Sequence, residues 1–134
     1  MIKINTIGKV NNKFKQPAAP EKMRKYNSEI IVKKEYEKGL EGIEENNYLQ
    51  VIFYFHLSEN YKLYGKRRHG SKRGVFASRS PHRPGQVGVT TVKLITRNDN
   101  RLEVKGLDAI DGTPVIDIKP YTSTFDEVNY FEKD

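Results

Sequence analysis

The chain has 134 residues and a formal net charge of +7, and it contains no cysteine. This length suits one domain, so we expect residues 1–134 to form a single unit. The lack of cysteine excludes disulfides, thiolate metal sites and cysteine nucleophiles. No apolar stretch reaches membrane-spanning length and the amino terminus has no secretory signal, which favours a soluble, cytoplasmic protein.

The excess positive charge is confined to the middle of the sequence. No acidic residue occurs between Glu59 and Asp99, whereas this segment holds ten of the 24 lysines and arginines. The remainder carries 14 basic and 17 acidic residues, a balance of −3. Such a distribution favours a polyanionic partner, and nucleic acid, a small phosphate compound or a membrane surface would each satisfy it.

The first half of the chain predicts short strands separated by irregular segments. Residues 1–10 mix polar and β-branched side chains in a pattern typical of a strand, and residues 11–25 predict a loop. Residues 29–32 indicate a short strand, and one helical turn is expected near residues 40–45. The strongest strand spans residues 48–55, YLQVIFYF, an almost unbroken apolar run that is typical of a core strand.

The second half begins with a basic loop and continues with further strands. The loop covers residues 60–73, and strands are expected at residues 74–77, 87–95, 101–106 and 113–118. Asp111 and Gly112 form a turn signal before the last of them. Many short strands without a convincing amphipathic helix predict an all-β fold with small α content, closed as a single-domain barrel.

The segment at residues 74–84, GVFASRSPHRP, is a candidate binding loop. Its two prolines restrict the backbone, and Arg79 and Arg83 supply planar donors beside serine hydroxyls. Such a loop suits an anion or a cofactor, or else it is an ordinary connection whose arginines face water.

Residues 106–114 place two carboxylates, Asp108 and Asp111, in one turn. By itself, the Asp111-Gly112 pair is more often ordinary turn chemistry. In the strand that follows, Asp117 and Lys119 share one face, which predicts an ion pair or a polar patch lining a pocket.

Other chemistries find little support in the sequence. His56, His69 and His82 are widely spaced without a metal-ligand pattern, so we expect no metal site. His56 directly follows the strongest strand and fits either a pocket residue or a capped core histidine. No GxGxxG motif follows a strand, which disfavours a dinucleotide-binding or Rossmann-type methyltransferase fold.

Two long motifs resemble the signature of a known family. The segments GVFASRSPHRP (74–84) with VGVTTVKL (87–94), and RLEVKGLDAIDGTPVIDIKPY (101–121), are similar to the core of the TrmO family of TsaA-like proteins. IGKV (7–10) and LQVIFYFH (49–56) resemble the opening and central strands of that family. The resemblance thus covers nearly the whole chain.

The resemblance implies a TsaA-like β-barrel, a homodimer, and S-adenosylmethionine as methyl donor. Members of this family methylate N6 of threonylcarbamoyladenosine, the modified base beside the anticodon of certain tRNAs. Carried over by motif position, the implied cofactor contacts are Met23, Arg24, Lys25, His56, Leu57, Arg79, Val89, Lys105, Gly106, Leu107 and Asp108.

The implied reaction needs a proton acceptor and a surface for RNA. Asp108 and Asp111 are the candidates for catalysis, and Arg83 is a candidate partner for the threonyl carboxylate of the substrate. We expect the remaining nucleic-acid contacts at Lys66, Arg67, Arg68, Lys72 and Arg73.

One departure from the family pattern is visible. After the RP dipeptide the family has Asn-Pro, whereas this chain has Gly85 and Gln86, from which we expect a looser rim of the site. The departure also motivates an alternative interpretation, a tRNA-binding barrel that has kept the fold and lost methyl transfer.

Overall fold

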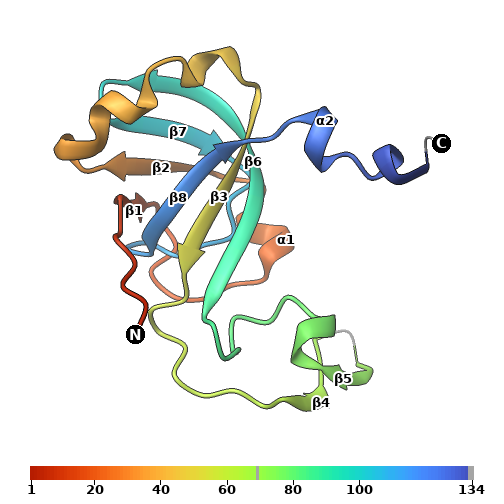
Figure 1. Cartoon of the computed structure of the whole chain (residues 1–134). Helices are drawn as coiled ribbons and strands as arrows, with labels where there is room; N and C mark the ends of the chain where they lie inside the picture. The colour runs from red at the N-terminus through yellow and green to blue at the C-terminus, as the bar shows by residue number, and fades with distance from the viewer. Residues whose placement is uncertain (69, 133–134) are drawn as a thin grey trace.

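The computed structural model, which describes residues 1–68 and 70–132, contains a closed barrel of antiparallel strands in the order β1-β2-β7-β6-β3-β8 (Figure 1). The bounds of these strands are β1 Gly8–Asn11, β2 Asn27–Val32, β3 Tyr48–Tyr54, β6 Val87–Asn98, β7 Arg101–Lys105 and β8 Pro114–Pro120. The all-β barrel expected from the sequence is therefore confirmed. No helix of the described residues is long and apolar enough to cross a membrane.

The barrel interior is filled by one face of each strand. In β3 the exposure alternates, so Leu49, Val51 and Phe53 are buried while Tyr48 and Tyr54 are exposed. The apolar run at residues 48–55 is the expected core strand, and it buries its inward face as a barrel strand does. The other strands contribute further buried residues to the core, among them Ile30, Val92, Leu102, Val104 and Val115.

Short helices close one side of the barrel. The 3-10 helices η1 (Lys34–Leu40) and η2 (Ile43–Glu45) occupy the segment where one helical turn was expected. Arg97 of β6 fastens them, because its guanidinium donates to the Leu40 carbonyl and to Glu44, both at 3.3 Å. One of the ten basic residues of the middle segment is thereby used inside the fold.

Two expected strands differ from their predicted bounds. Of residues 1–10 only Gly8–Val10 lie in β1, and Met1, Ile2 and Ile4 before it are exposed, so the first part of the alternating pattern does not reflect a buried face. Residues 75–77 form the 3-10 helix η3 (Val75–Ala77) instead of a strand. Val75 is its single buried residue, and its N–H donates to the Leu63 carbonyl at 2.8 Å.

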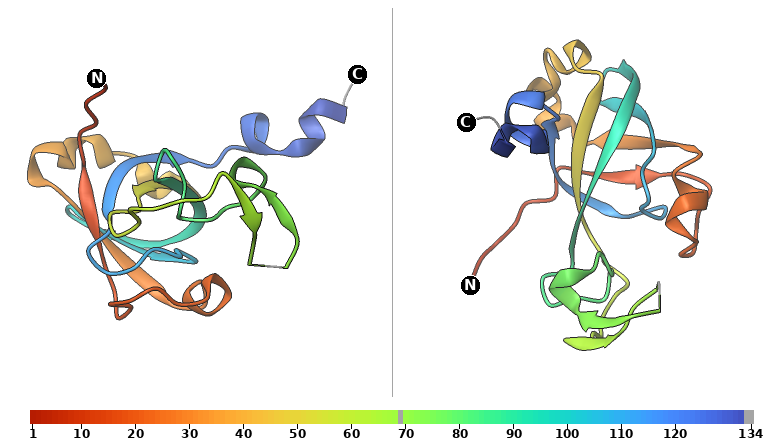
Figure 2. Two further views of the ribbon diagram at one scale, coloured as in Figure 1. Left: turned by 90° about the horizontal axis from the view of Figure 1, so that it is seen from below. Right: turned by 90° about the vertical axis from the view of Figure 1, so that its right-hand side faces the viewer.

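The basic segment is a projecting hairpin. The strands β4 (Tyr64–Lys66) and β5 (Lys72–Gly74) pair outside the barrel sheet, where the sequence had predicted only a loop. Both views in Figure 2 show this hairpin standing apart from the barrel. A second projection consists of α2 (Ser123–Asp126) and η4 (Val128–Glu132), which lead away from the barrel after β8.

Candidate functional site

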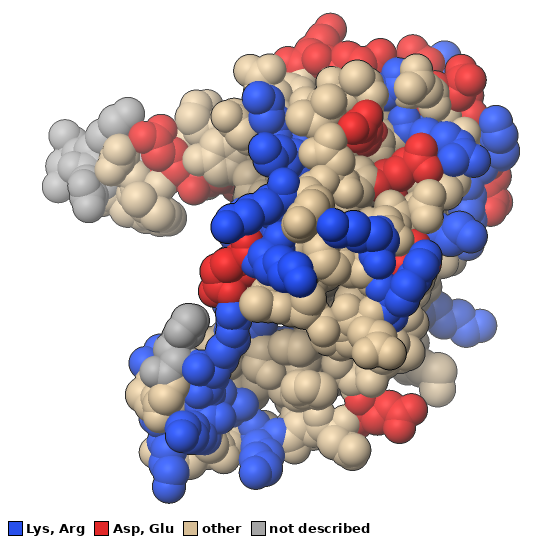
Figure 3. Space-filling model, turned by 180° about the vertical axis from the view of Figure 1, so that it is seen from behind, with Lys and Arg blue, Asp and Glu red and all other residues tan. Residues whose placement is uncertain are grey.

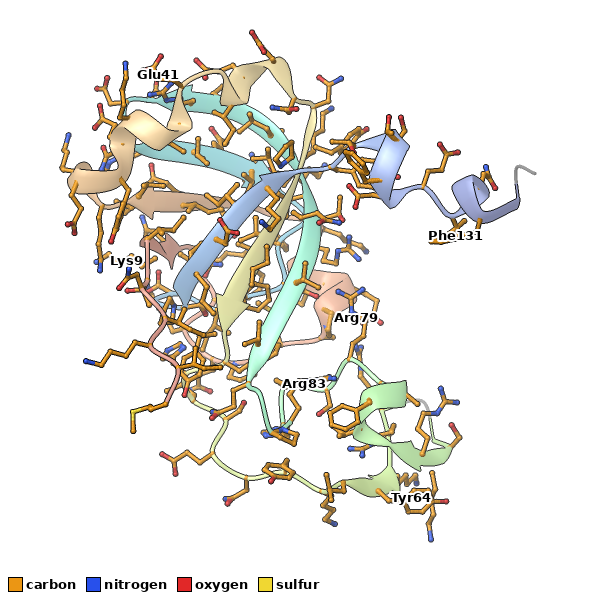
Figure 4. All side chains as sticks on the ribbon, viewed as in Figure 1. Lys9, Glu41, Tyr64, Arg79, Arg83 and Phe131 are labelled. Atoms are coloured by element: carbon orange, nitrogen blue, oxygen red, sulfur yellow. The ribbon has the colours of Figure 1, made fainter. Side chains whose placement is uncertain are left out.

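An open strand edge organises the site. The twelve residues of β6 pair with β3 through Val87–Lys93, whereas β7 joins the other edge only from Lys93 onward. The carbonyls of the preceding β6 residues on that edge need other partners. The guanidinium of Arg79 donates to the Val89 carbonyl, and that of Arg24 donates to the Thr91 carbonyl at 3.5 Å. Two arginines thus donate to the edge that β7 leaves free, and Figure 4 shows Arg79 beside β6.

The turn that follows β7 lies against the same edge. Gly106 has a φ of +103°, a conformation that favours glycine, and its carbonyl accepts a hydrogen bond of 3.0 Å from Nε of Arg24. Leu107 is buried, and the carboxylate of Asp108 accepts a hydrogen bond from the Thr90 hydroxyl. Arg24 therefore joins β6 to the turn.

Thr90 is a site residue that the sequence reasoning missed. Its side chain is buried on the inward face of β6, in line with Val92. A hydroxyl at a position that the strand alternation assigns to the core needs a polar partner, which is the signal that would have identified it. Here that partner is Asp108.

The other expected cofactor contacts differ in how far they are exposed to solvent. Met23, the last residue of α1 (Pro20–Met23), is buried, whereas Lys25 and Lys105 are exposed. His56 is half-buried and Leu57 is 62% exposed. They follow β3, whose last residue Tyr54 pairs with Val87, so they lie where β6 begins.

Gly88 makes room for an aromatic pair beneath this end of the barrel. The rings of Phe53 and Phe55 meet edge-on with centroids 5.3 Å apart. A Cβ on Gly88 would lie 2.7 Å from Phe55 Cζ and 2.8 Å from Phe53 Cε2, closer than real contacts. The absence of a side chain at residue 88 therefore lets the two rings pack under the start of β6.

The loop at Gln86 is held by its own contacts, contrary to the expected loosening. The Gln86 amide donates to the carbonyls of Phe55, at 3.2 Å, and Ser58, and its Oε1 accepts from the Tyr54 hydroxyl at 3.3 Å. Its backbone carbonyl accepts from the Phe55 N–H at 2.8 Å. The φ of Gln86 is +51°, which a proline ring cannot adopt. Glutamine fixes this rim by hydrogen bonds where the family pattern has a proline.

Asp111 lies in a different environment from Asp108. Its carboxylate accepts hydrogen bonds from Lys15 Nζ at 2.8 Å and from the backbone N–H of Asn12 at 2.9 Å. The Lys15 hydrogen bond, followed by that of Asn12, lowers the pKa of Asp111 below its usual value. Asp111 therefore anchors the segment after β1.

The ion pair expected between Asp117 and Lys119 of β8 is present, with 3.1 Å between Lys119 Nζ and Asp117 Oδ2.

Arg67 ties the two sides of the basic hairpin together. Its guanidinium donates to the carbonyls of Lys62 at 2.9 Å, Leu63 at 3.3 Å and Arg73 at 3.1 Å. Arg73 donates to Ser71 Oγ at 2.8 Å. Two of the expected nucleic-acid contacts thus also shape the hairpin itself.

The remaining basic residues of this region differ in their partners. Arg68 pairs with Glu21 of α1, which ties the hairpin to the segment that carries Arg24. Arg83 donates from Nη1 to the carbonyls of Ser78 at 3.0 Å and Ser80 at 3.1 Å, and it stabilises its own loop. Lys66 and Lys72 have no ionic or hydrogen-bond partner within the described residues. Figure 3 shows the concentration of Lys and Arg on the projecting hairpin.

No group of three or more potential metal ligands occurs within residues 1–68 and 70–132. His69 lies outside the described residues. Two surface hollows, of about 270 and 490 Å³, lie elsewhere on the barrel and are lined by none of the expected cofactor contacts. The expected cofactor contacts therefore border an exposed strand edge, that of β6, and not one of these two hollows.

Comparison with known proteins places these features in a family. Residues 7–127 match the family described as the tRNA-methyltransferase O N-terminal domain. A probable S-adenosyl-L-methionine-binding protein of Archaeoglobus fulgidus is 41% identical over 96% of this chain, which spans 36% of that protein. A tRNA (adenine(37)-N6)-methyltransferase of Mus musculus is 43% identical over 67% of this chain and 22% of its own length.

A solved structure has the same fold. The crystal structure of TrmO from Pseudomonas aeruginosa superimposes with a TM-score of 0.74 and 30% identity, covering 96% of this chain and 59% of the other. The chain therefore spans about a third of the Archaeoglobus relative and less than two thirds of the solved structure.

Proposed function

Because the chain belongs to the tRNA-methyltransferase O N-terminal domain family, we propose that it binds S-adenosylmethionine at the open edge of β6 and methylates N6 of threonylcarbamoyladenosine in tRNA. The observation that carries this proposal is the convergence of Arg24, Arg79 and Asp108 on that edge. They come from three segments far apart in the sequence. The names of the relatives, one a binding protein and another a tRNA adenine-N6 methyltransferase, agree with it.

The donor set suits the chemistry of this cofactor. S-adenosylmethionine carries a carboxylate, an ammonium group, a sulfonium and an apolar-faced adenine. Arg24 and Arg79 provide cationic donors for a carboxylate, and Asp108 has a second carboxylate oxygen for an ammonium group or hydroxyl. Val89, 44% exposed, and Leu57 offer apolar surface for a purine ring.

The residues of this chain would contribute to the reaction mainly by positioning and proton removal. When bound, S-adenosylmethionine supplies an electrophilic methyl group. The carbamoylated N6 of the substrate carries a proton that must leave, and a nearby carboxylate is the natural acceptor. Asp108 lies at the open edge of β6, whereas the carboxylate of Asp111 is held by Lys15 and the Asn12 N–H in the segment after β1. We therefore assign the proton to Asp108 and an anchoring role to Asp111.

We also propose that the chain forms a symmetric dimer with a second copy of itself. The arm after β8 carries Phe125, which is 81% exposed, and Val128, which is also exposed. The arm has a defined local structure, because Thr122 caps α2 through the Phe125 N–H at 3.3 Å and its own N–H donates to Asp126 at 2.8 Å. An ordered arm with exposed apolar side chains suits contact with a symmetric partner.

The test is calorimetry with S-adenosylmethionine. The native chain is expected to bind, and Arg79→Ala is expected to lose about 1.5–3 kcal/mol, the cost of a charge-assisted hydrogen bond. Arg101→Ala is the matched control, because Arg101 pairs with Glu29 at 3.0 Å on the outer surface of β2 and β7. Equal affinity of the Arg79 and Arg101 variants would contradict the placement of the site. Absence of binding by the native chain would contradict the function.

A further inference from the structure

One face of the β4–β5 hairpin has an unusual composition. In the β4–β5 register Tyr64 lies opposite Gly74, and Lys66 lies opposite Lys72. Residues directly opposite in an antiparallel pair, and residues two apart along a strand, lie on the same face. One face therefore combines an aromatic ring, two lysines and a glycine.

The ring of Tyr64 is open to solvent. Tyr64 is 66% exposed, and its cross-strand neighbour is a glycine without a side chain to cover it. In Figure 4 Tyr64 lies on the projecting hairpin, away from the barrel. Aromatic side chains this exposed, beside positive charge, are the platforms on which proteins stack unpaired bases.

The two lysines form a like-charge pair. Directly opposed like charges destabilise an antiparallel pair, and no acidic side chain of the described residues pairs with Lys66 or Lys72. A phosphate between them would remove this repulsion. Two cross-strand ammonium groups next to an exposed ring thus complement the two parts of a nucleotide, its phosphate and its base.

The hairpin is preorganised for such a contact. An isolated hairpin with three-residue strands is marginally stable, but here Arg67 donates to three carbonyls on both sides of it. Arg68 ties it to Glu21, close in sequence to Arg24 at the proposed cofactor edge. Little ordering is therefore left for a bound strand to impose.

We propose that this face binds unpaired RNA, with a base stacked on Tyr64 and the adjoining phosphate held between Lys66 and Lys72. This inference rests on the proposed function, from which the identity of the RNA as tRNA is taken. It adds that the hairpin binds an unpaired segment of that tRNA. An unpaired segment such as a loop presents its bases, whereas a duplex hides them in the stack. The hairpin would then hold the loop that contains the target base near the β6 edge.

The experiment measures fluorescence anisotropy with a labelled oligouridylate of about eight nucleotides and with an RNA duplex of equal length. Tyr64→Leu is expected to weaken oligouridylate binding about tenfold or more, whereas Tyr64→Phe, which keeps the ring, stays close to native. Tyr48→Leu is the matched control, since Tyr48 is 48% exposed on the barrel. Lys66→Gln with Lys72→Gln should reduce the salt slope by roughly 0.7 per lost phosphate contact. The matched double variant Lys34→Gln with Lys38→Gln, on η1, should leave the salt slope unchanged.

Specific outcomes would overturn the proposal. Equal loss in Tyr64→Phe and Tyr64→Leu would assign the contact to the hydroxyl and refute stacking. An unchanged affinity of Tyr64→Leu for oligouridylate, or duplex binding as strong as single-strand binding, would refute base stacking and show that the hairpin binds RNA through its positive charge alone. Cofactor calorimetry on the same variants separates the two proposals. Tyr64-dependent RNA binding without S-adenosylmethionine binding would leave this inference standing and remove the proposed function.

Discussion

Replacing Gln86 by proline tests whether this chain holds the rim of its site in a different way from its family. Proline removes the Gln86 N–H, which donates to the Arg83 carbonyl at 3.2 Å, and demands a φ near −65° where the chain has +51°. It also removes the amide that bonds the Phe55 and Ser58 carbonyls. The perturbation therefore acts on both the backbone and the side chain.

The magnitude follows from these losses. Three side-chain hydrogen bonds contribute about 0.5–1.5 kcal/mol each, and the lost backbone bond a similar amount. A residue forced from a left-handed conformation adds strain of order 1–3 kcal/mol, so Gln86→Pro should lower the free energy of unfolding by at least about 3 kcal/mol. Gln86→Gly is the matched control. It keeps the left-handed backbone and loses only the three side-chain bonds, for about 1.5–4.5 kcal/mol, partly offset by relief at φ +51°.

The assay combines urea denaturation with cofactor calorimetry. We expect the order native, Gln86→Gly, Gln86→Pro in both stability and affinity for S-adenosylmethionine. Adding Gly85→Asn to Gln86→Pro restores the family pattern at both positions. If that double variant were as stable as the native chain and bound the cofactor more tightly, the reasoning from the Gln86 contacts would be refuted.

Three further predictions concern other parts of the fold. Gly88→Ala should destabilise the chain by about 1–3 kcal/mol in urea titrations, because its Cβ would overlap the Phe55 ring, and an unchanged midpoint would show that the ring has room to move. Asp111→Asn should cost about 0.2–1 kcal/mol at neutral pH through the loss of the Lys15 pair. Because the folded-state pKa of Asp111 is lowered, its contribution is complete above about pH 4 and is lost as the pH falls further, so the difference between variant and native chain should vanish in acid. Light scattering should find the native chain at twice 15.5 kDa and Phe125→Ser shifted toward the monomer, and a native monomer would remove the second copy from the account.

The sequence was most informative where one physical demand dominates. The alternation of inward and outward residues along residues 101–105 located β7 to within a residue of its end. Residues 1–5 carry a similar alternation but are exposed, and the local pattern does not distinguish the two segments. The hairpin at residues 64–74 was missed because its strands are three residues long and depend on Arg67, a contact that no local pattern reveals.

The candidate site was predictable only as a set of motifs. Arg79 and Asp108 were identified through their motifs, but their meeting at the edge of β6 depends on where β7 stops pairing. Thr90 and Gln86 act through contacts that are remote in sequence, and neither belongs to a recognised motif role. Registers and edges are properties of the closed barrel, so the contacts of these two residues could be determined only from the structure.

Methylation of tRNA by this chain can be measured in a single incubation. The native chain and Arg79→Ala are each mixed with cellular tRNA and S-adenosylmethionine labelled on its methyl group, and the tRNA is then digested to nucleosides and separated by mass. We expect label on N6 of threonylcarbamoyladenosine with the native chain, and much less label with Arg79→Ala. Unlabelled tRNA, or label confined to another nucleoside, would contradict the proposed function.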